Sequence, residues 1–210
     1  MLHRVLGSIV ASLVVQGAAI TIITNGQLLG DRISDFSKAA SVHVSLPSTD
    51  PNKYAAKTGG AIDLVIEGLE RLRSLAPDIR LKINSVFDVA DEANASNIDE
   101  LLRLCSFFGA SLKLIARFDP HSKTSSSALH VLKKLCKLGY FREKWDGRTL
   151  TFNKSGSAPA EITETACSAA HRHPNFCNVC SKWGDLYIGV DCSTFICPWG
   201  NFGHAGVGAL

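Results

Sequence analysis

The sequence predicts an α/β protein with parallel strands, followed by a small cysteine-rich segment. Short β-branched runs alternate with amphipathic helical stretches along residues 1–120. The helices between these runs are long enough to form crossover connections, which place consecutive strands parallel in one sheet. Five of the seven cysteines then fall within residues 161–210. We therefore expect one α/β domain that carries a C-terminal metal or cluster segment.

The composition gives little direct information about function. The net charge of +3 and the 20% of charged residues are ordinary values, and no block of lysine and arginine indicates a nucleic-acid partner. Two cysteines outside the C-terminal segment, Cys105 and Cys136, lie among apolar helical positions, where we expect them in the core. An odd number of cysteines argues against a secreted disulfide framework and favours metal ligands in a reducing cytoplasm.

The first 24 residues are apolar enough to be compared with a signal peptide or a single membrane span. Gln16 and Gly17 interrupt this run. Apolar residues have helical spacing before the interruption, and a β-branched run at residues 19–23 follows it. A helix, a glycine stop and a buried strand explain the segment without a membrane, and a membrane tether is the alternative.

Each later element has a local signal. Asp50 followed by Pro51 is typical of a helix N-cap and first helical position, and Ser96 with Asp99 three residues later has the pattern of a capping box. Gly109 ends the helix that starts at Ser96, and Gly139 ends the helix after it. The expected elements are a helix at 28–40, a strand at 42–46, a helix after Asp50, a helix over about 62–76, a strand at 79–87, a helix from Ser96, a strand at 111–116, a helix over 129–138 and a hairpin over 140–152.

Polar side chains alternate with apolar ones along several expected strands. His43 and Ser45 lie on the second strand, Lys82 and Asn84 on the third, and Lys113 on the fourth. In a parallel sheet covered on both faces, such groups are costly to bury without partners. Their recurrence on successive strands predicts a barrel lumen that holds a polar ligand. Each of them taken alone is equally compatible with a long side chain that reaches solvent from a strand end.

The C-terminal cysteines have the spacing of a metal or cluster site. Cys177 and Cys180 form a Cys-x-x-Cys pair, Cys192 and Cys197 follow, and Cys167 lies upstream. Clustered thiolates bind either zinc or an iron–sulfur cluster, and their spacing does not separate these two possibilities.

In order and spacing, the expected strands and helices resemble the later βα units of radical SAM enzymes. The similarity is greatest to the GTP cyclase branch of molybdenum-cofactor synthesis. The resemblance covers about residues 6–119. It implies a partial (β/α) barrel in which a 4Fe–4S cluster reduces S-adenosylmethionine (SAM) to a radical that abstracts hydrogen from a substrate. The matching series is Thr24-Asn25-Gly26, residues 42–46 with Asp50-Pro51 and Thr58-Gly59-Gly60, residues 81–84, and residues 112–115.

The resemblance implies roles for four residues and for several partners. Thr24 and Asn25 match a threonine and an asparagine at a strand end that faces the active site. Ser45 matches a serine that contacts SAM, and Lys82 matches a lysine that reaches the substrate. The resemblance also implies a small-molecule or peptide substrate and an electron donor such as ferredoxin or flavodoxin.

The cysteine segment is similar to the auxiliary 4Fe–4S extensions of the same superfamily. In that pattern Cys177, Cys180 and Cys197 are ligands, with a β-hairpin at 186–191 between the pair and the last ligand. The fourth ligand is either of the other two cysteines of the segment or the substrate, with Cys167 favoured. The resulting division is a partial barrel at 1–120, a helix, hairpin and linker at 121–160, and the auxiliary cluster segment at 161–210.

Two features depart from the family pattern. The sequence contains no Cys-x-x-x-Cys-x-x-Cys, the motif that holds the SAM-cleaving cluster, so we expect this chain alone to be inactive and to be an N-terminally truncated form. After Cys180, residues 181–185 replace the arginine-rich motif of the GTP cyclases, which argues against GTP as the substrate. The alternative function is that of a non-catalytic, zinc-binding α/β protein.

Overall fold

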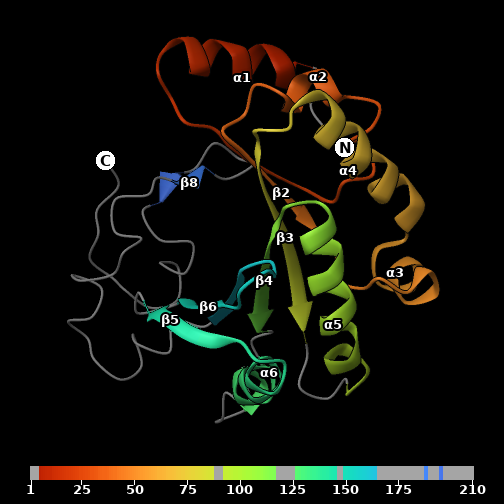
Figure 1. The fold of residues 1–210 in the computed structure, drawn as a ribbon. Helices are drawn as coiled ribbons and strands as arrows, with labels where there is room; N and C mark the ends of the chain where they lie inside the picture. The colour runs from red at the N-terminus through yellow and green to blue at the C-terminus, as the bar shows by residue number, and fades with distance from the viewer. Residues whose placement is uncertain are drawn as a thin grey trace.

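The computed structural model describes residues 5–87, 92–116, 126–145, 149–164, 187–188 and 194–195. A seven-stranded sheet with the order β1-β2-β3-β4-β7-β6-β5 forms its centre (Figure 1). The strands are β1 (Thr21–Thr24), β2 (Ser41–Ser45), β3 (Arg80–Phe87), β4 (Ser111–Ala116), β5 (Phe141–Trp145), β6 (Thr149–Asn153) and β7 (Ala160–Glu164). The first five strands in this order are mutually parallel, and the β5–β6 hairpin continues the sheet in antiparallel fashion.

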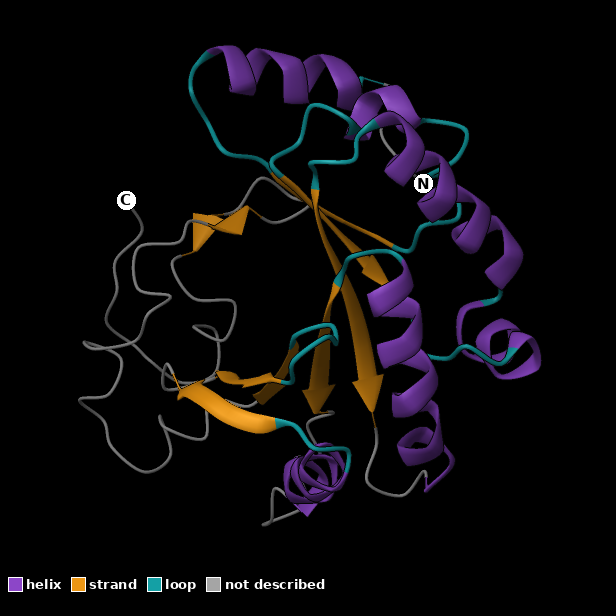
Figure 2. Cartoon of the chain, in the orientation of Figure 1, coloured by secondary structure: helices purple, strands orange, loops and turns teal. Residues whose placement is uncertain are grey.

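Helices lie along one face of the parallel strands, as Figure 2 shows for the two long helices beside the central strands. The helices are α1 (Leu6–Val15), α2 (Ile33–Phe36), α3 (Pro51–Thr58), α4 (Ile62–Leu75), α5 (Glu92–Phe107) and α6 (Ser126–Lys137). Every second side chain of β2, β3 and β4 packs into the core on this face. The core between sheet and helices contains Val42, Val44, Leu81, Ile83, Leu112 and Leu114 from the strands and Val65, Leu69, Leu72, Leu101 and Cys105 from the helices.

The structure confirms the predicted mixed α/β fold with mostly parallel strands. The N-cap prediction is confirmed by the Asp50 carboxylate, which accepts a hydrogen bond from the Lys53 amide at 2.9 Å. At the N-terminus, α1 ends before Gly17, whose φ of 83° is left-handed, and β1 follows. No helix within the described ranges is long and apolar enough to span a bilayer.

Two predicted helix boundaries were wrong. The helix expected at residues 28–40 is reduced to α2, because turns occupy residues 27–32. The helix expected to start at Ser96 already begins at Glu92, so Ser96 lies inside α5 rather than at its N-cap. A capping pattern marks a possible start, but residues before it that favour helix can extend the helix beyond it.

The structure corrects one core prediction and adds a strand. Cys105 is fully buried as predicted, but Cys136 is exposed. The α6 residues that pack into the core are Val131 and Leu135, and Cys136 falls on the flank of that stripe. Beyond the turn at 155–159, predicted as a linker, the chain forms β7, which pairs with both β4 and β6.

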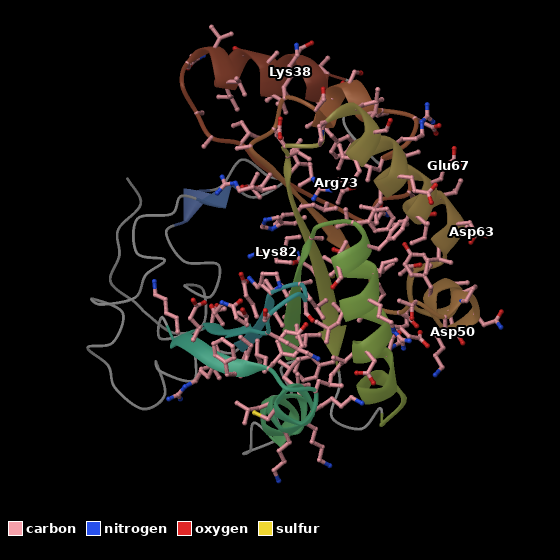
Figure 3. The ribbon with its side chains drawn as sticks, viewed as in Figure 1. Lys38, Asp50, Asp63, Glu67, Arg73 and Lys82 are labelled. Atoms are coloured by element: carbon pink, nitrogen blue, oxygen red, sulfur yellow. The ribbon has the colours of Figure 1, made fainter. Side chains whose placement is uncertain are left out.

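One arginine connects the amino-terminal ends of the central strands. The Arg73 guanidinium donates to the carbonyl oxygens of Pro77 at 2.9 Å and Ile79 at 2.8 Å, and to those of Phe108 and Gly109 before β4. In Figure 3 its side chain points inward, whereas Glu67 on the same helix points outward. A planar guanidinium has enough fixed donors for all four acceptors. Burial lowers the Arg73 pKa without removing its charge at neutral pH.

We expect Arg73→Ala to lower the free energy of unfolding by about 2–3 kcal/mol, because four carbonyl groups lose a charged donor. Arg73→Lys should recover only part of the loss, since an ammonium group cannot reproduce the planar fork. The matched control is Arg71→Ala on the exposed side of α4, where the pair with Glu67 is 3.9 Å long and its loss should cost less than about 0.5 kcal/mol. Urea denaturation measures the free energy of unfolding of all three variants. Equal losses in Arg73→Ala and Arg71→Ala would contradict the role of Arg73 in holding the strand ends.

Candidate functional site

The face of the sheet opposite the helices carries the polar side chains that alternate along the strands. Strand register sets them in rows that cross the sheet. In Figure 3, Lys82 projects from β3 on the side away from α5. The rows, from the amino to the carboxyl ends of the strands, are Thr21, Ser41 and Arg80; then Ile23, His43, Lys82 and Ser111; then Ser45, Asn84, Lys113 and Glu161; then Val86, Ile115 and Thr163. The five polar residues predicted to line a lumen therefore share one face.

An ion pair crosses the centre of this polar face. Lys82 Nζ lies 2.8 Å from each carboxylate oxygen of Glu161, and the two side chains are 23% and 22% exposed. Because β4 lies between β3 and β7, the pair bridges two strands that are not neighbours. Glu161 is not among the residues predicted from the sequence, although the alternation of apolar and polar residues at 160–163 is a signal for this strand.

His43 lies in the same row as Lys82 and has a lowered pKa of about 4. Burial is the largest cause, because it disfavours the charged imidazolium. The positive charges of Lys82, Lys113 and Arg80 lower the pKa further, and the Glu161 carboxylate opposes them. His43 is therefore a neutral imidazole at pH 7, available as a hydrogen-bond donor or acceptor.

Asn84 and Ser45 are adjacent on neighbouring strands, one row closer to the carboxyl ends. The Asn84 side-chain oxygen is buried and has no hydrogen-bond partner in the described part of the chain. An unsatisfied buried acceptor is costly, and a bound molecule that donates a hydrogen bond would remove that cost. The polar face therefore fits a ligand with donor groups beside Ser45.

The other two residues with a role implied by the resemblance lie at the carboxyl end of β1. Thr24 is buried, and its hydroxyl accepts a hydrogen bond from the Gly26 amide at 3.1 Å. Asn25 is exposed, and its side-chain oxygen accepts from the Gln27 amide at 3.2 Å. Both side chains thus stabilise the turn that leaves the strand.

Gln27 links this turn to the loop between α3 and α4. Its side chain donates to the Ala61 carbonyl at 2.9 Å and accepts from the Ala61 amide at 3.0 Å, and it also donates to the buried Tyr54 hydroxyl at 3.1 Å. A Cβ atom at Gly60 would lie 2.6 Å from the Gln27 side chain, so a larger residue there would require the Gln27 amide to move. Gly60 belongs to a motif recognised in the sequence, whereas Gln27, which lies against it, was not predicted.

The predicted cysteine ligands lie outside the described residues. These are Cys167, Cys177, Cys180, Cys192 and Cys197. Between Cys180 and Cys197 the strands β8 (Tyr187–Ile188) and β9 (Thr194–Phe195) pair antiparallel, so a hairpin forms there with bounds different from the expected 186–191. Among the residues that the structure describes, no group of three or more His, Cys, Asp and Glu side chains could hold a metal ion.

The chain is similar in sequence to two proteins described as probable GTP 3',8-cyclases. It is 33% identical over 112 residues to the one from Pyrobaculum aerophilum and 34% identical over 100 residues to the one from Methanococcus vannielii. These matches cover 51% and 46% of this chain and 36% and 32% of the relatives. The chain is related to the GTP cyclase branch of the radical SAM superfamily. No model of a known protein family matches it.

The fold agrees with this relationship. Streptococcus suis SuiB bound to S-adenosylmethionine superposes with a TM-score of 0.62 and 14% sequence identity, over 96% of this chain and 47% of SuiB. SuiB has also been solved with its precursor peptide SuiA. The chain thus spans about a third of the length of the curated relatives it matches and about half of SuiB. At this identity SuiB supports the radical SAM-like fold and no residue role.

The charges around His43 predict opposite shifts of its pKa in two variants. Lys82→Met removes a neighbouring cation and should raise the pKa above about 4, whereas Glu161→Gln removes the opposing carboxylate and should lower it. The exposed Lys53→Met is the control and should leave it unchanged. NMR titration of the imidazole measures all three, and shifts of the same sign in the first two variants would contradict this electrostatic arrangement.

The lowered pKa also predicts acid sensitivity. The folded pKa of about 4 is below the ordinary value of 6.5, so the unfolded chain binds the proton more readily between these values. The stability contributed by neutral His43 is complete above pH 6.5 and is lost as the pH falls to about 4. Urea denaturation across this pH window should show that the free energy of unfolding depends less on pH in His43→Gln than in the parent chain. An equal pH dependence in the two proteins would rule out His43 as its source.

Proposed function

We propose that this chain forms the later βα units of a radical SAM-type barrel, with its polar face as part of the substrate chamber. The similarity to GTP 3',8-cyclases supports the family, and the shared orientation of His43, Lys82, Asn84 and Lys113 supports a chamber for a polar molecule. The observation that carries the proposal is the Lys82–Glu161 pair, which sets both charges at the centre of that face. The substrate is a small molecule or a peptide.

Within this chamber the residues present position the substrate rather than cleave SAM. Lys82 provides a positive charge that a carboxylate or phosphate of the substrate can share with Glu161. Neutral His43 and the Asn84 amide provide hydrogen bonds without adding charge. Ser45 lies beside Asn84 and is the residue we assign to SAM contact, with Thr24 and Asn25 holding the adjacent strand end.

SAM bound to a reduced 4Fe–4S cluster supplies the hydrogen-abstracting radical in this chemistry, with electrons from a ferredoxin or flavodoxin. The three-cysteine motif for that cluster is not in this sequence, so the chamber residues act together with a part that provides it. We further propose that Cys177, Cys180 and Cys197, with Cys167 as fourth ligand, hold an auxiliary 4Fe–4S cluster. The hairpin between Cys180 and Cys197 supports this arrangement.

Anaerobic reconstitution of the chain with iron and sulfide tests the auxiliary cluster. We expect about four irons per chain and the visible absorption of an iron–sulfur cluster. The Cys177→Ser and Cys180→Ser variants should lose most of the bound iron and most of the visible absorption, because each substitution removes a thiolate ligand. Cys136→Ser is the matched control, since Cys136 is exposed and distant in sequence from the segment, and it should retain the cluster.

The same preparation tests the alternative function. Stoichiometric zinc that resists replacement by iron, with no visible absorption, would contradict the cluster and favour a zinc-binding module. A cluster that survives both cysteine substitutions would contradict the ligand assignment. Cys105 cannot substitute as a ligand without local unfolding, because burial raises its pKa to about 12 and keeps it a protonated thiol.

The chain alone should not cleave SAM. Incubation of the reconstituted protein with SAM and dithionite should give no 5′-deoxyadenosine above the level of a protein-free control. Production of 5′-deoxyadenosine that depends on the protein would contradict the proposal that another part supplies the SAM-cleaving cluster.

A further inference from the structure

Residues 5–24 form a stretch of the chain that has no charged side chain. The stretch comprises α1, the loop after it and β1. Because 20% of all residues in the chain are charged, an ordinary stretch of this length would carry about four charges. Most of its residues are nevertheless exposed. We call the exposed side chains of residues 5–24 the uncharged surface, and an apolar surface of this kind is typical of a contact with another molecule.

The outward face of α1 is apolar. Val5, Ile9 and Leu13 recur at every fourth residue, so they lie in one stripe along the helix, and they are 47%, 46% and 39% exposed. Val10 is the only residue of α1 that is buried, and the helix lies at the outside of the fold beside α2 (Figure 1). The polar side chains of α1 are two serines. A helix on the surface of a protein normally turns a charged face to solvent, and α1 does not.

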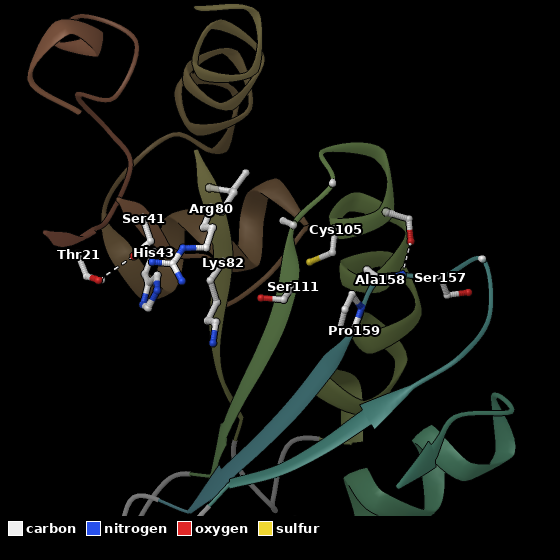
Figure 4. A pocket seen from close by; sticks show the side chains of 15 residues that line it. Thr21, Ser41, His43, Arg80, Lys82, Cys105, Ser111, Ser157, Ala158 and Pro159 are labelled. Carbon is white, nitrogen blue, oxygen red and sulfur yellow. Dashed lines mark hydrogen bonds between the residues drawn. The ribbon is translucent and has the colours of Figure 1, made fainter. Parts of the chain in front are cut away.

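The two edge strands of the sheet differ in their protection against pairing with another chain. The β5 strand carries Arg142, Glu143 and Lys144, and its register shifts between Arg142 and Lys144. Charged residues and irregular register both discourage a further strand from pairing. The β1 strand has neither feature. Its inner side pairs with β2, where the Thr21 and Ser41 hydroxyls are 2.7 Å apart (Figure 4), and no described strand pairs with its outer side.

The absence of charge favours a second copy of this chain as the molecule that covers this surface. In an interface with twofold symmetry a surface meets its own copy, so like charges on it would repel one another. A different protein is commonly selected by complementary charges, and a membrane surface attracts helices whose polar face is basic. The uncharged surface has no group for either kind of selection. Two edge strands related by a twofold axis can also pair with each other.

We propose that two copies of this chain associate through the uncharged surface, with α1 packed against α1 of the second copy. A twofold axis near Ile9, the middle residue of the stripe, places Val5 of one copy opposite Leu13 of the other. Ten helical residues span about 15 Å, which is short for a standard interface of about 800 Å² per partner, so residues 16–24 must contribute as well. We therefore expect a weak dimer, with a dissociation constant of about 10 μM.

Sedimentation velocity of the full chain, in the presence of a reductant, tests the dimer. At about 100 μM the parent chain should sediment mainly as a dimer. Ile9→Lys should raise the dissociation constant at least about tenfold, because it places two like charges opposite each other in an apolar contact. The matched control is Leu64→Lys, since Leu64 is an apolar residue of α4 that is 49% exposed and lies outside the uncharged surface. This control should dimerise like the parent chain.

A mixture of charge variants tests the twofold symmetry. Ile9→Lys and Ile9→Glu should each be monomeric, whereas an equimolar mixture of the two should form a dimer, because opposite charges then meet across the axis. Circular dichroism melting checks that both variants fold. If either variant is unfolded, Ser12→Lys and Ser12→Glu take their place, since Ser12 is exposed and its substitution leaves the apolar stripe intact. Each of these must also dissociate the dimer.

Several results would overturn the proposal. They are a monomeric parent chain at 100 μM, a dimer that persists in Ile9→Lys, equal dissociation in Ile9→Lys and Leu64→Lys, and a mixture of the Lys and Glu variants that stays monomeric. A monomeric parent chain that binds phosphatidylcholine vesicles, with binding lost in Ile9→Lys, would assign the surface to a membrane instead. No result depends on cluster assembly or on SAM, so the dimer and the proposed function can fail separately.

Discussion

The structure depends on a parallel sheet whose two faces have different surroundings. Helices α4 and α5 cover one face, and the apolar residues of each strand pack there. The alternating side chains must then point to the opposite face, where polar groups need partners. Lys82 and Glu161 satisfy each other across β4, and that pair fixes the position of positive and negative charge on the face. The low pKa of His43 is a consequence of the same arrangement, since burial and the nearby cations both disfavour its protonation.

Two sets of hydrogen bonds hold the opposite edges of this sheet. At the amino edge, the Arg73 guanidinium donates hydrogen bonds to carbonyl groups that precede β3 and β4. These bonds hold the first residues of both strands, which line a cavity at this edge. At the carboxyl edge, Gln27 joins the turn after β1 to the loop before α4, where Gly60 allows close approach. Each network uses a side chain with several donors or acceptors, so one residue stabilises several loops. Each edge is therefore held by its own network of hydrogen bonds.

The proposed chamber would account for the polar groups on this face. The matched region is a part of longer relatives. In the barrel that we propose, the polar side of the sheet is the side that encloses the ligands. The buried Asn84 side-chain oxygen has no hydrogen-bond partner among the described residues, which agrees with this view, because a protein rarely leaves a buried acceptor without a ligand or water to complete it. His43 and Lys82 of the proposed chamber also line a cavity at the amino-terminal ends of the strands (Figure 4).

The sequence determined those features that depend on neighbouring residues. Strand alternation placed Lys82 and Asn84 on one side and Leu81 and Ile83 on the other, and Asp50 with Pro51 marked a helix start, because period and capping are local properties. Tertiary structure alone decided the partners. Glu161 meets Lys82 because β7 inserts beside β4 after an intervening helix and hairpin, a pairing that no local pattern specifies. Likewise Cys136 is exposed while Cys105 is buried, since the face of a helix that packs inward depends on what lies against it.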